Sequence, residues 1–501
     1  MSKQITTTVN QFFGGVSDSS RKSSANEFII SKHFDIFSDP QKLIPYRSLE
    51  SDDTSASSHD MKQYSVKDFV YASTSAKLYG LGKTGAGLTK IVYKADATTG
   101  NWTLPASSEG NGAVKNGCLV EFKDYLWGFQ GTNQIFKWGL LSGTPSITNT
   151  ATGGTVGSTI TSVANGVIYS ATGELFLAYN NAIVRVETNL TITDIAKTVP
   201  SDLKITSLTN FGNYIAIGCA PISTFNGRSK VFLWNGSSDL FQETIDWGEG
   251  ELRILENIEG ILVGVTDRYL NNSTGAGKGS MIVQAYTGSS PQVLKEVFTQ
   301  ALTGKIMPIS KATKNNRLFW TAKIMTNSAG TEYNEGIWSF GRKNANYPYT
   351  ITLDVIDENV TSAGIQAFGN AGNFFFIAHS ADGSIDKTDD QANYLFTSIY
   401  ESQIFDFGDV DSDKRLESVK VSFAPLTSGN VVTVKYKVEE DVSWTTIGSI
   451  STVGEVSRTF LNIESSGANF ASGKEYKFQI TSYGGAEITS YKLKATVLSN
   501  P

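Results

Sequence analysis

The segment GELFLAYNNAIVRVE, residues 173–187, shows the pattern that decides the fold. A polar turn containing glycine precedes five apolar residues, a second polar turn follows, and another short apolar stretch ends the unit. Apolar runs of this length between turn signals are typical of buried strands, and they are too short for helices. We therefore expect an all-β chain of short strands joined by tight turns.

The pattern occurs in seven copies between residues 68 and 388, including the one at 173–187. The first residues of successive copies are about 40 to 56 residues apart, as expected for four-stranded sheets repeated along a chain. Stacking such sheets in a closed ring covers both faces of each one. The sequence predicts a β-propeller of about seven blades over residues 63–400, and an irregular β-solenoid is the alternative. The copies are DFVYAS with KIVYK (68–94), DYLWGF with QIFKWG (124–139), GELFLAY with AIVRVE (173–187), GNYIAIG with KVFLWN (212–235), GILVGV with MIVQAY (260–286), NRLFWTA with GIWSFG (316–341) and GNFFFIAHSADGSIDKT (372–388).

The two ends of the chain differ from this repeat. Residues 1–62 are polar with short apolar islands, which predicts an extended N-terminal arm that docks on the propeller or on a neighbouring subunit, or orders only in a complex. The arm is also a candidate donor of a strand to the last blade. Beyond residue 400 the strands alternate with period two, as in Val419, Val421 and Phe423, so residues 401–501 are expected to form a jelly-roll-like β-sandwich.

Composition argues against several classes of function. Charged residues make up 18% of the chain, the net charge is -6, and no long run of Lys or Arg occurs, so we expect no sequence-specific nucleic acid binding. No stretch approaches about 18 apolar residues, and the opening MSKQITTTVNQFFGG lacks the features of a secretory signal. We expect synthesis in the cytosol, no membrane insertion, and buried core positions for the only cysteines, Cys118 and Cys219.

Residues for acid-base or nucleophilic catalysis are scarce. The chain has three histidines, His33, His59 and His379, and the last follows an apolar run, where a structural role is expected. The segment GLGKTGAGLTK (80–90) departs from the phosphate-binding loop pattern and lies between two strands, which predicts a hairpin. We therefore expect neither an enzyme nor a cofactor.

The loop GDVDSDKRLES carries the one candidate metal site. Asp409, Asp411 and Asp413 have the alternate spacing that begins a calcium loop, with Glu417 in reach. The loop lacks the glycine and the glutamate that an EF-hand has at its sixth and twelfth positions, so a solvated turn is the alternative. A second aspartate cluster has the same two interpretations: Asp382, Asp386, Asp389 and Asp390.

Three segments resemble structural proteins of tailed bacteriophages, in particular tail nozzle or hub proteins that carry a propeller. They are TTTVNQFFGGVSDS (6–19), FIISKHFDIFSDPQKLIPYRS (28–48) and YESQIFDFGDVDSDKRLESVKV (400–421). The resemblance implies a virion component made in the host cytoplasm, a subunit of a homo-oligomeric ring that contacts other tail proteins through the arm and the sandwich. It assigns no functional residue.

Two other classes stay open. The first is a glycan-hydrolysing or glycan-binding propeller with a carbohydrate-binding sandwich, and the second is a cellular scaffold or adhesin. For the glycan class, tryptophans beside the alternating strands are candidates for stacking on sugars, with core packing as the alternative. These are Trp102, Trp247, Trp338 and Trp444.

Overall fold

The computed structural model shows an all-β chain, with one short 3-10 helix, Met61–Tyr64, among the residues that it describes. These residues are 3–12, 14, 28–52, 61–94, 101–105, 109–113, 118–142, 146–149, 157–222, 227–270, 278–299, 305–325, 333–356, 365–379, 384–388, 394, 396–439, 441–462 and 470–498. The chain forms two compact units. The first comprises Met1–Ser48, Ile337–Ile356 and Asp389–Pro501, and the second comprises Leu49–Gly336 and Asp357–Thr388.

The second unit consists of antiparallel sheets that follow one another along the chain. Five of these sheets, among the described residues, each take their strands from one continuous stretch of the chain. Their strands are β6 (Asp68–Ala72), β7 (Lys77–Lys83), β8 (Leu88–Lys94), β9 (Trp102–Thr103) and β10 (Glu109–Ala113); β11 (Val120–Phe122), β12 (Tyr125–Gln130), β13 (Gln134–Gly139) and β14 (Ser146–Asn149); β15 (Val163–Ile168), β16 (Leu175–Tyr179), β17 (Ala182–Val186) and β18 (Ile192–Thr198); β19 (Leu203–Phe211), β20 (Tyr214–Pro221), β21 (Arg228–Trp234) and β22 (Glu243–Glu249); and β23 (Glu251–Ile258), β24 (Ile261–Leu270), β25 (Lys278–Tyr286) and β26 (Gln292–Thr299).

A hairpin and a composite sheet complete this unit. The hairpin pairs β27 (Lys305–Lys314) with β28 (Arg317–Met325). The composite sheet has the order β31 (Ile365–Ala371), β32 (Phe374–His379), β33 (Ile385–Thr388) and β5 (Leu49–Ser51). Its last strand comes from the N-terminal part of the chain and pairs Glu50 with Lys387. A strand that precedes the repeats therefore completes the sheet that ends them.

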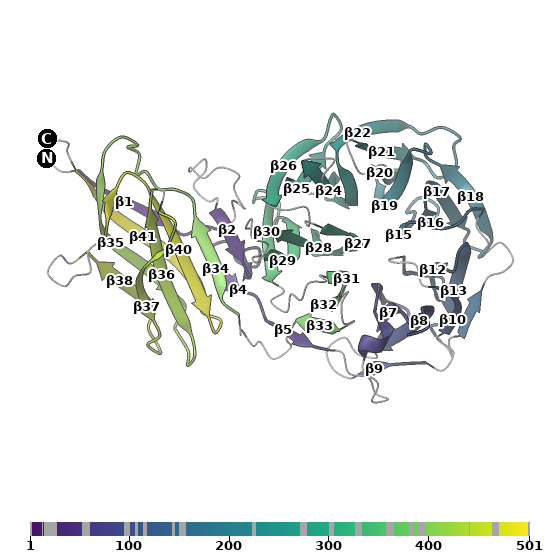
Figure 1. Ribbon diagram of the computed structural model, residues 1–501, viewed down its shortest axis with the longest axis horizontal. Helices are drawn as coiled ribbons and strands as arrows, with labels where there is room; N and C mark the ends of the chain where they lie inside the picture. Colours follow the sequence, from purple (N-terminus) through teal and green to yellow (C-terminus); the bar gives the residue numbers. More distant parts are fainter. Residues whose placement is uncertain are drawn as a thin grey trace. The chain divides into compact units, whose positions relative to one another are not determined.

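The first strands of the sheets contact one another in a closed circle. The order is β6, β11, β15, β19, β23, β27, β31 and back to β6, and Figure 1 shows the sheets around this circle with β15, β19, β27 and β31 near its centre. Antiparallel sheets arranged radially in a closed ring define a β-propeller. The all-β propeller fold expected from the repeats is confirmed.

The apolar runs found in the sequence mostly form the second strand of each sheet. The run Leu175–Tyr179 is buried at every position, as expected for a strand covered on both faces. The first copy is an exception, because DFVYA forms the first strand β6 while the second strand, β7, lies in the glycine-containing stretch KLYGLGK. Strands β7 and β8 form an antiparallel hairpin around residues 84–87, as the sequence indicated.

The first unit contains two larger sheets and a short two-stranded one. One has the order β1 (Gln4–Val9), β41 (Ile488–Val497), β35 (Lys414–Phe423) and β38 (Ser457–Leu461), with β39 (Ser472–Gly473) also on β35. The other runs through β30 (Thr350–Ile356), β2 (Phe28–Lys32), β34 (Ser398–Ser402), β40 (Tyr476–Tyr483), β36 (Val431–Val438) and β37 (Thr445–Ile450). The short sheet pairs β3 (Phe34–Asp35) with β4 (Ile44–Pro45).

Both larger sheets of the first unit contribute to one core. Val419 and Val421 come from β35, while Val432 and Val434 come from β36, and all four are buried in the same cluster. Phe12, from the N-terminal segment, is fully buried there and lies edge-on to Tyr400 with ring centroids 5.5 Å apart. The alternating pattern of the C-terminal strands thus marks the buried face of each sheet.

The division of the chain differs from the three ranges expected from the sequence. Residues 1–62 were expected as an extended arm, but β1 pairs along its length with β41 and β2 lies between β30 and β34. Strand β29 (Tyr333–Gly341) carries the chain from the second unit back to the first. The first unit is therefore assembled from three separate segments, and a short strand such as β2 pairs only with strands that are distant in the sequence.

Candidate functional site

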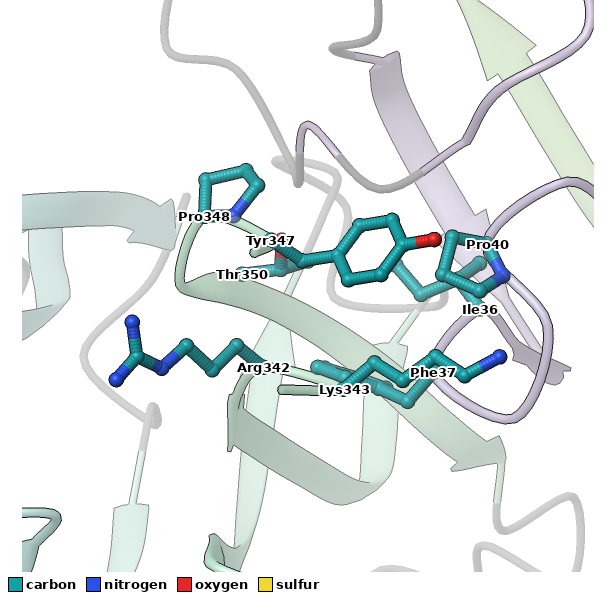
Figure 2. Close-up of a pocket in the computed structure, with 8 residues that line it drawn as sticks. All are labelled: Ile36, Phe37, Pro40, Arg342, Lys343, Tyr347, Pro348 and Thr350. Atoms are coloured by element: carbon teal, nitrogen blue, oxygen red, sulfur yellow. The ribbon is translucent and has the colours of Figure 1, made fainter. Parts of the chain in front are cut away.

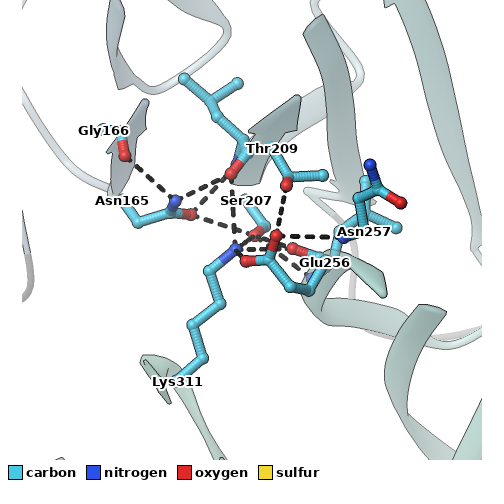
Figure 3. A network of polar contacts seen from close by, with 9 residues as sticks. Asn165, Gly166, Ser207, Thr209, Glu256, Asn257 and Lys311 are labelled. Carbon is cyan, nitrogen blue, oxygen red and sulfur yellow. Dashed lines mark hydrogen bonds and ion pairs between the residues drawn. The ribbon is translucent and has the colours of Figure 1, made fainter. Parts of the chain in front are cut away.

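A polar network joins four of the first strands of the propeller (Figure 3). Its centre is Lys311 on β27, whose side chain is 10% exposed. The ammonium nitrogen lies 2.9 Å from Glu256 Oε2 and donates to the carbonyl oxygen of Leu255 at 2.6 Å. It also reaches Ser207 Oγ at 3.2 Å and the Leu208 carbonyl oxygen at 3.4 Å. One lysine therefore bonds to two neighbouring first strands, β19 and β23.

Asn165 on β15 extends the network to a fourth strand. Its Oδ1 accepts from Ser207 Oγ and from the Leu208 backbone N–H, both at 3.0 Å, and its Nδ2 donates to the Leu208 carbonyl at 2.8 Å. The amide thus bonds to β19 much as a neighbouring strand would. At this contact between the first strands of two adjacent sheets, side-chain hydrogen bonds take the place of backbone-to-backbone ones.

Glu256 is held from several sides. Its Oε1 accepts from Thr209 Oγ1 and from the Asn257 backbone N–H, while Oε2 faces Lys311. A carboxylate that is 18% exposed requires such partners because burial of an unpaired charge is costly. The network neutralises both charges inside the ring and stabilises the contact between sheets.

A second charged cluster holds the closing strand β5 in place. Lys94 contacts Asp52 directly after β5, Trp102 Nε1 donates to the other oxygen of Asp52 at 3.1 Å, and Lys387 pairs with Glu50 at 3.1 Å. Burial raises the pKa of Asp52 and lowers that of Lys94, while their mutual attraction opposes both shifts. These contacts attach the N-terminal strand to the first and last sheets by charge as well as by backbone pairing.

His379 and the second aspartate cluster lie at the end of the last sheet. His379 on β32 is 6% exposed, and its Nε2 lies 3.0 Å from Asp386 Oδ2 on β33. The pair connects adjacent strands. Asp382, Asp389, Asp390 and His59 lie outside the described residues.

The candidate calcium loop is organised by Asp409. Its Oδ1 accepts from the backbone N–H groups of Asp411 and Ser412 at 3.1 Å, and its carbonyl oxygen accepts from Lys414. Hydrogen bonds from Ser412 lower the pKa of Asp409. The side chains of Asp411 and Asp413 are exposed. In the described part of the chain, no group of three or more His, Cys, Asp or Glu side chains has a metal-binding arrangement.

Burial separates the four tryptophans that were considered for sugar stacking. Trp102, Trp247 and Trp338 are 0%, 1% and 4% exposed, so they are core residues. Trp444 alone of the four is not among the buried residues. Cys118 and Cys219 are also buried, and burial raises the pKa of both thiols.

The first unit contains a small pocket beside the β3 and β4 pair (Figure 2). Its cavity volume is about 10 Å³, far less than the roughly 300 Å³ at which small-molecule sites usually begin. Tyr347, Pro40 and Ile36 face it, and the guanidinium of Arg342 lies 4.5 Å from the ring centre of neighbouring Tyr349. Its size and lining indicate packing between segments rather than a ligand site.

Comparison with solved structures returns β-propeller proteins at low identity. Virginiamycin B lyase from Staphylococcus aureus, in a catalytically inactive form with quinupristin, is 12% identical, with 68% of this chain and 98% of that chain covered and a TM-score of 0.42. BamB from Moraxella catarrhalis is 12% identical, covering 76% and 97%, with a TM-score of 0.35. A chain of the mitotic checkpoint complex is 9% identical, covering 68% and 93%, with a TM-score of 0.39.

No protein-family model and no curated protein sequence matches the chain. Among the described residues, no helix has the length and apolar character required to span a membrane.

Proposed function

We propose that this protein is a structural component of a bacteriophage virion, a nozzle-like or hub-like subunit of a homo-oligomeric ring in the tail. It acts by protein-protein assembly with further copies and with other tail proteins, without a cofactor. The proposal includes a seven-bladed propeller and a β-sandwich made by the two larger sheets of the first unit. In this proposal, the N-terminal segment is part of the sandwich instead of forming a free arm.

The observation that carries the proposal is the composition of the first unit. Its N-terminal strand β1 pairs in register with the C-terminal strand β41, from Gln4 opposite Thr496 to Val9 opposite Tyr491. The propeller is thus inserted in the sequence between segments that together form the first unit. A unit in which strands from three separate segments pair with one another suits a subunit that must stay intact within an assembly. The segments that resemble tail proteins, 6–19, 28–48 and 400–421, contribute strands to the first unit.

The first unit also offers a way to build a ring. Its sheet β1-β41-β35-β38 has β1 and β38 as edge strands among the described residues. Edge strands present unpaired backbone groups that pair with another chain. Leu461 on β38 and Val456 before it are 55% and 51% exposed. We propose that β38 of one copy faces β1 of the next, because a head-to-tail contact of two different surfaces closes into a ring.

The mass of the purified chain in solution, measured by light scattering with negative-stain images, tests this assembly. We expect closed rings and a mass that is a multiple of 54.2 kDa. Leu461→Lys places a charge on the proposed contact and should reduce the assembly to monomers. Leu240→Lys is the control, because Leu240 is 75% exposed on the second unit. Rings that persist in Leu461→Lys would exclude β38 as the contact, and a wild-type monomer would contradict ring formation.

A further inference from the structure

Trp444 lies at a polar pocket on the first unit. It directly precedes β37 and follows the turn after β36. The ammonium of Lys437 lies 4.9 Å from the centre of the indole ring and donates to the carbonyl oxygen of Val442 at 2.5 Å. These contacts hold the indole at the wall of a pocket of about 170 Å³ that is open to solvent. That volume is below the roughly 300 Å³ of a typical enclosed small-molecule site, so a ligand would lie partly in the pocket and partly in solvent.

The pocket is lined by carboxylates that have spare acceptor capacity. Glu401 accepts from Gln479 Nε2 at 2.8 Å, Glu439 Oε1 from the Lys474 N–H at 2.9 Å, and Asp441 Oδ2 from the Val438 N–H at 3.1 Å. In each carboxylate one oxygen is used, and the second has no partner among the described residues. Each can accept hydrogen bonds from a hydroxyl group.

The same pocket contains an ammonium donor, Lys477. Lys477 on β40 is directly opposite Lys437 on β36, and its ammonium has no hydrogen bond or ion pair within the described part of the chain. Two like charges opposite each other on adjacent strands are unfavourable. A ligand oxygen that accepts from Lys477 would relieve part of that cost. The pocket therefore combines an aromatic ring, carboxylate acceptors and an ammonium donor.

We propose that this pocket binds a neutral saccharide. A sugar offers an apolar ring face for an indole and hydroxyl groups that both donate and accept, and the pocket supplies a partner for each. Three carboxylates and two ammonium groups give it both signs of charge, which disfavours a strongly anionic or cationic ligand. The inference is independent of ring assembly, because every lining residue belongs to the first unit of one chain.

Saturation-transfer NMR of the full-length chain with maltose, cellobiose, lactose and chitobiose tests the proposal. We expect transfer to the ring protons of at least one of these disaccharides. Trp444→Ala should weaken binding of that sugar about tenfold or more, since aromatic contacts contribute on the order of a factor of ten. Trp444→Phe should retain part of the affinity, and Lys477→Met should weaken it with the indole intact.

The matched control is Tyr483→Ala, which removes an aromatic side chain that is 42% exposed at the far end of the same strand β40. Binding should be unchanged in this variant. Absence of transfer to all four disaccharides would overturn the proposal, as would equal transfer in wild type and Trp444→Ala. Binding of glucuronate or inorganic phosphate alone would show that the site takes anions, which also contradicts the inference.

Discussion

Replacing Lys311 by methionine tests whether the polar network stabilises the propeller ring. Methionine retains most of the apolar stem of lysine but removes the ammonium that contacts Glu256, Ser207 and two backbone carbonyls. Breaking a buried ion pair by removing one partner costs about 3 to 5 kcal/mol. Glu256 keeps its hydrogen bonds from Thr209 and the Asn257 N–H and is 18% exposed, so we expect the low end of that range, about 3 kcal/mol.

The control for this change is Arg228→Met. Arg228 pairs with Asp246 at 2.9 Å, but both side chains are 54% exposed, and exposed pairs contribute only about 0.2 to 1 kcal/mol. The assay is urea unfolding of the full chain, followed by tryptophan fluorescence. The double variant Lys311→Met with Glu256→Gln should recover part of the loss, because no unpaired charge then remains. Equal losses in Lys311→Met and Arg228→Met would refute a stabilising role for the network.

Three further predictions concern stability. Burial lowers the pKa of His33 to about 4, so the stability that is present above pH 6.5 is lost as the pH falls through 4, by about 3 kcal/mol. The free energy of unfolding, measured at pH 7 and pH 4, should show this loss in wild type, and the His33 contribution should be missing in His33→Asn. Burial raises the pKa of Asp68 to about 7, so the stability that is present at low pH is lost as the pH rises through 7, by about 3 kcal/mol between pH 5 and 8. The free energy of unfolding of Asp68→Asn, measured at both pH values, should not show this loss. A Cβ on Gly82 would lie 2.1 Å from the backbone oxygen of Tyr64, whereas one on Gly85 meets nothing within 4 Å. Gly82→Ala should therefore lower the free energy of unfolding by at least about 2 kcal/mol. Equal melting temperatures for Gly82→Ala and Gly85→Ala would contradict this reasoning.

The propeller could be predicted because its signal is local. A second strand such as Leu175–Tyr179 is covered on both faces, so its burial appears directly as an apolar run. The glycine-rich β7 gave no such run, although it is buried over most of its length. Glycine provides room there for close backbone contact instead of an apolar side chain, as the approach of Tyr64 to Gly82 shows.

The polar network and the segmented first unit could not be predicted in the same way. Lys311 lies in the stretch KIMPISKATK, which looks like an ordinary amphipathic strand, and its partners are 55 to 104 residues away in the sequence. Strand β1 is rich in threonine and has no apolar run, yet it pairs with β41 at the other end of the chain. Such contacts depend on which distant segments the closed ring and the two sheets bring together. Trp444 was recognised as a candidate, but only burial separates it from Trp102, Trp247 and Trp338.

The most direct test of the proposed function is to locate the chain in particles from its source. Antibody labelling of virus particles purified on a density gradient, viewed by negative-stain electron microscopy, shows whether the chain is in the tail. The proposal predicts label at the tail, on a ring that contains several copies. Particles without label, together with a 54.2 kDa monomer found only in the soluble fraction, would contradict it.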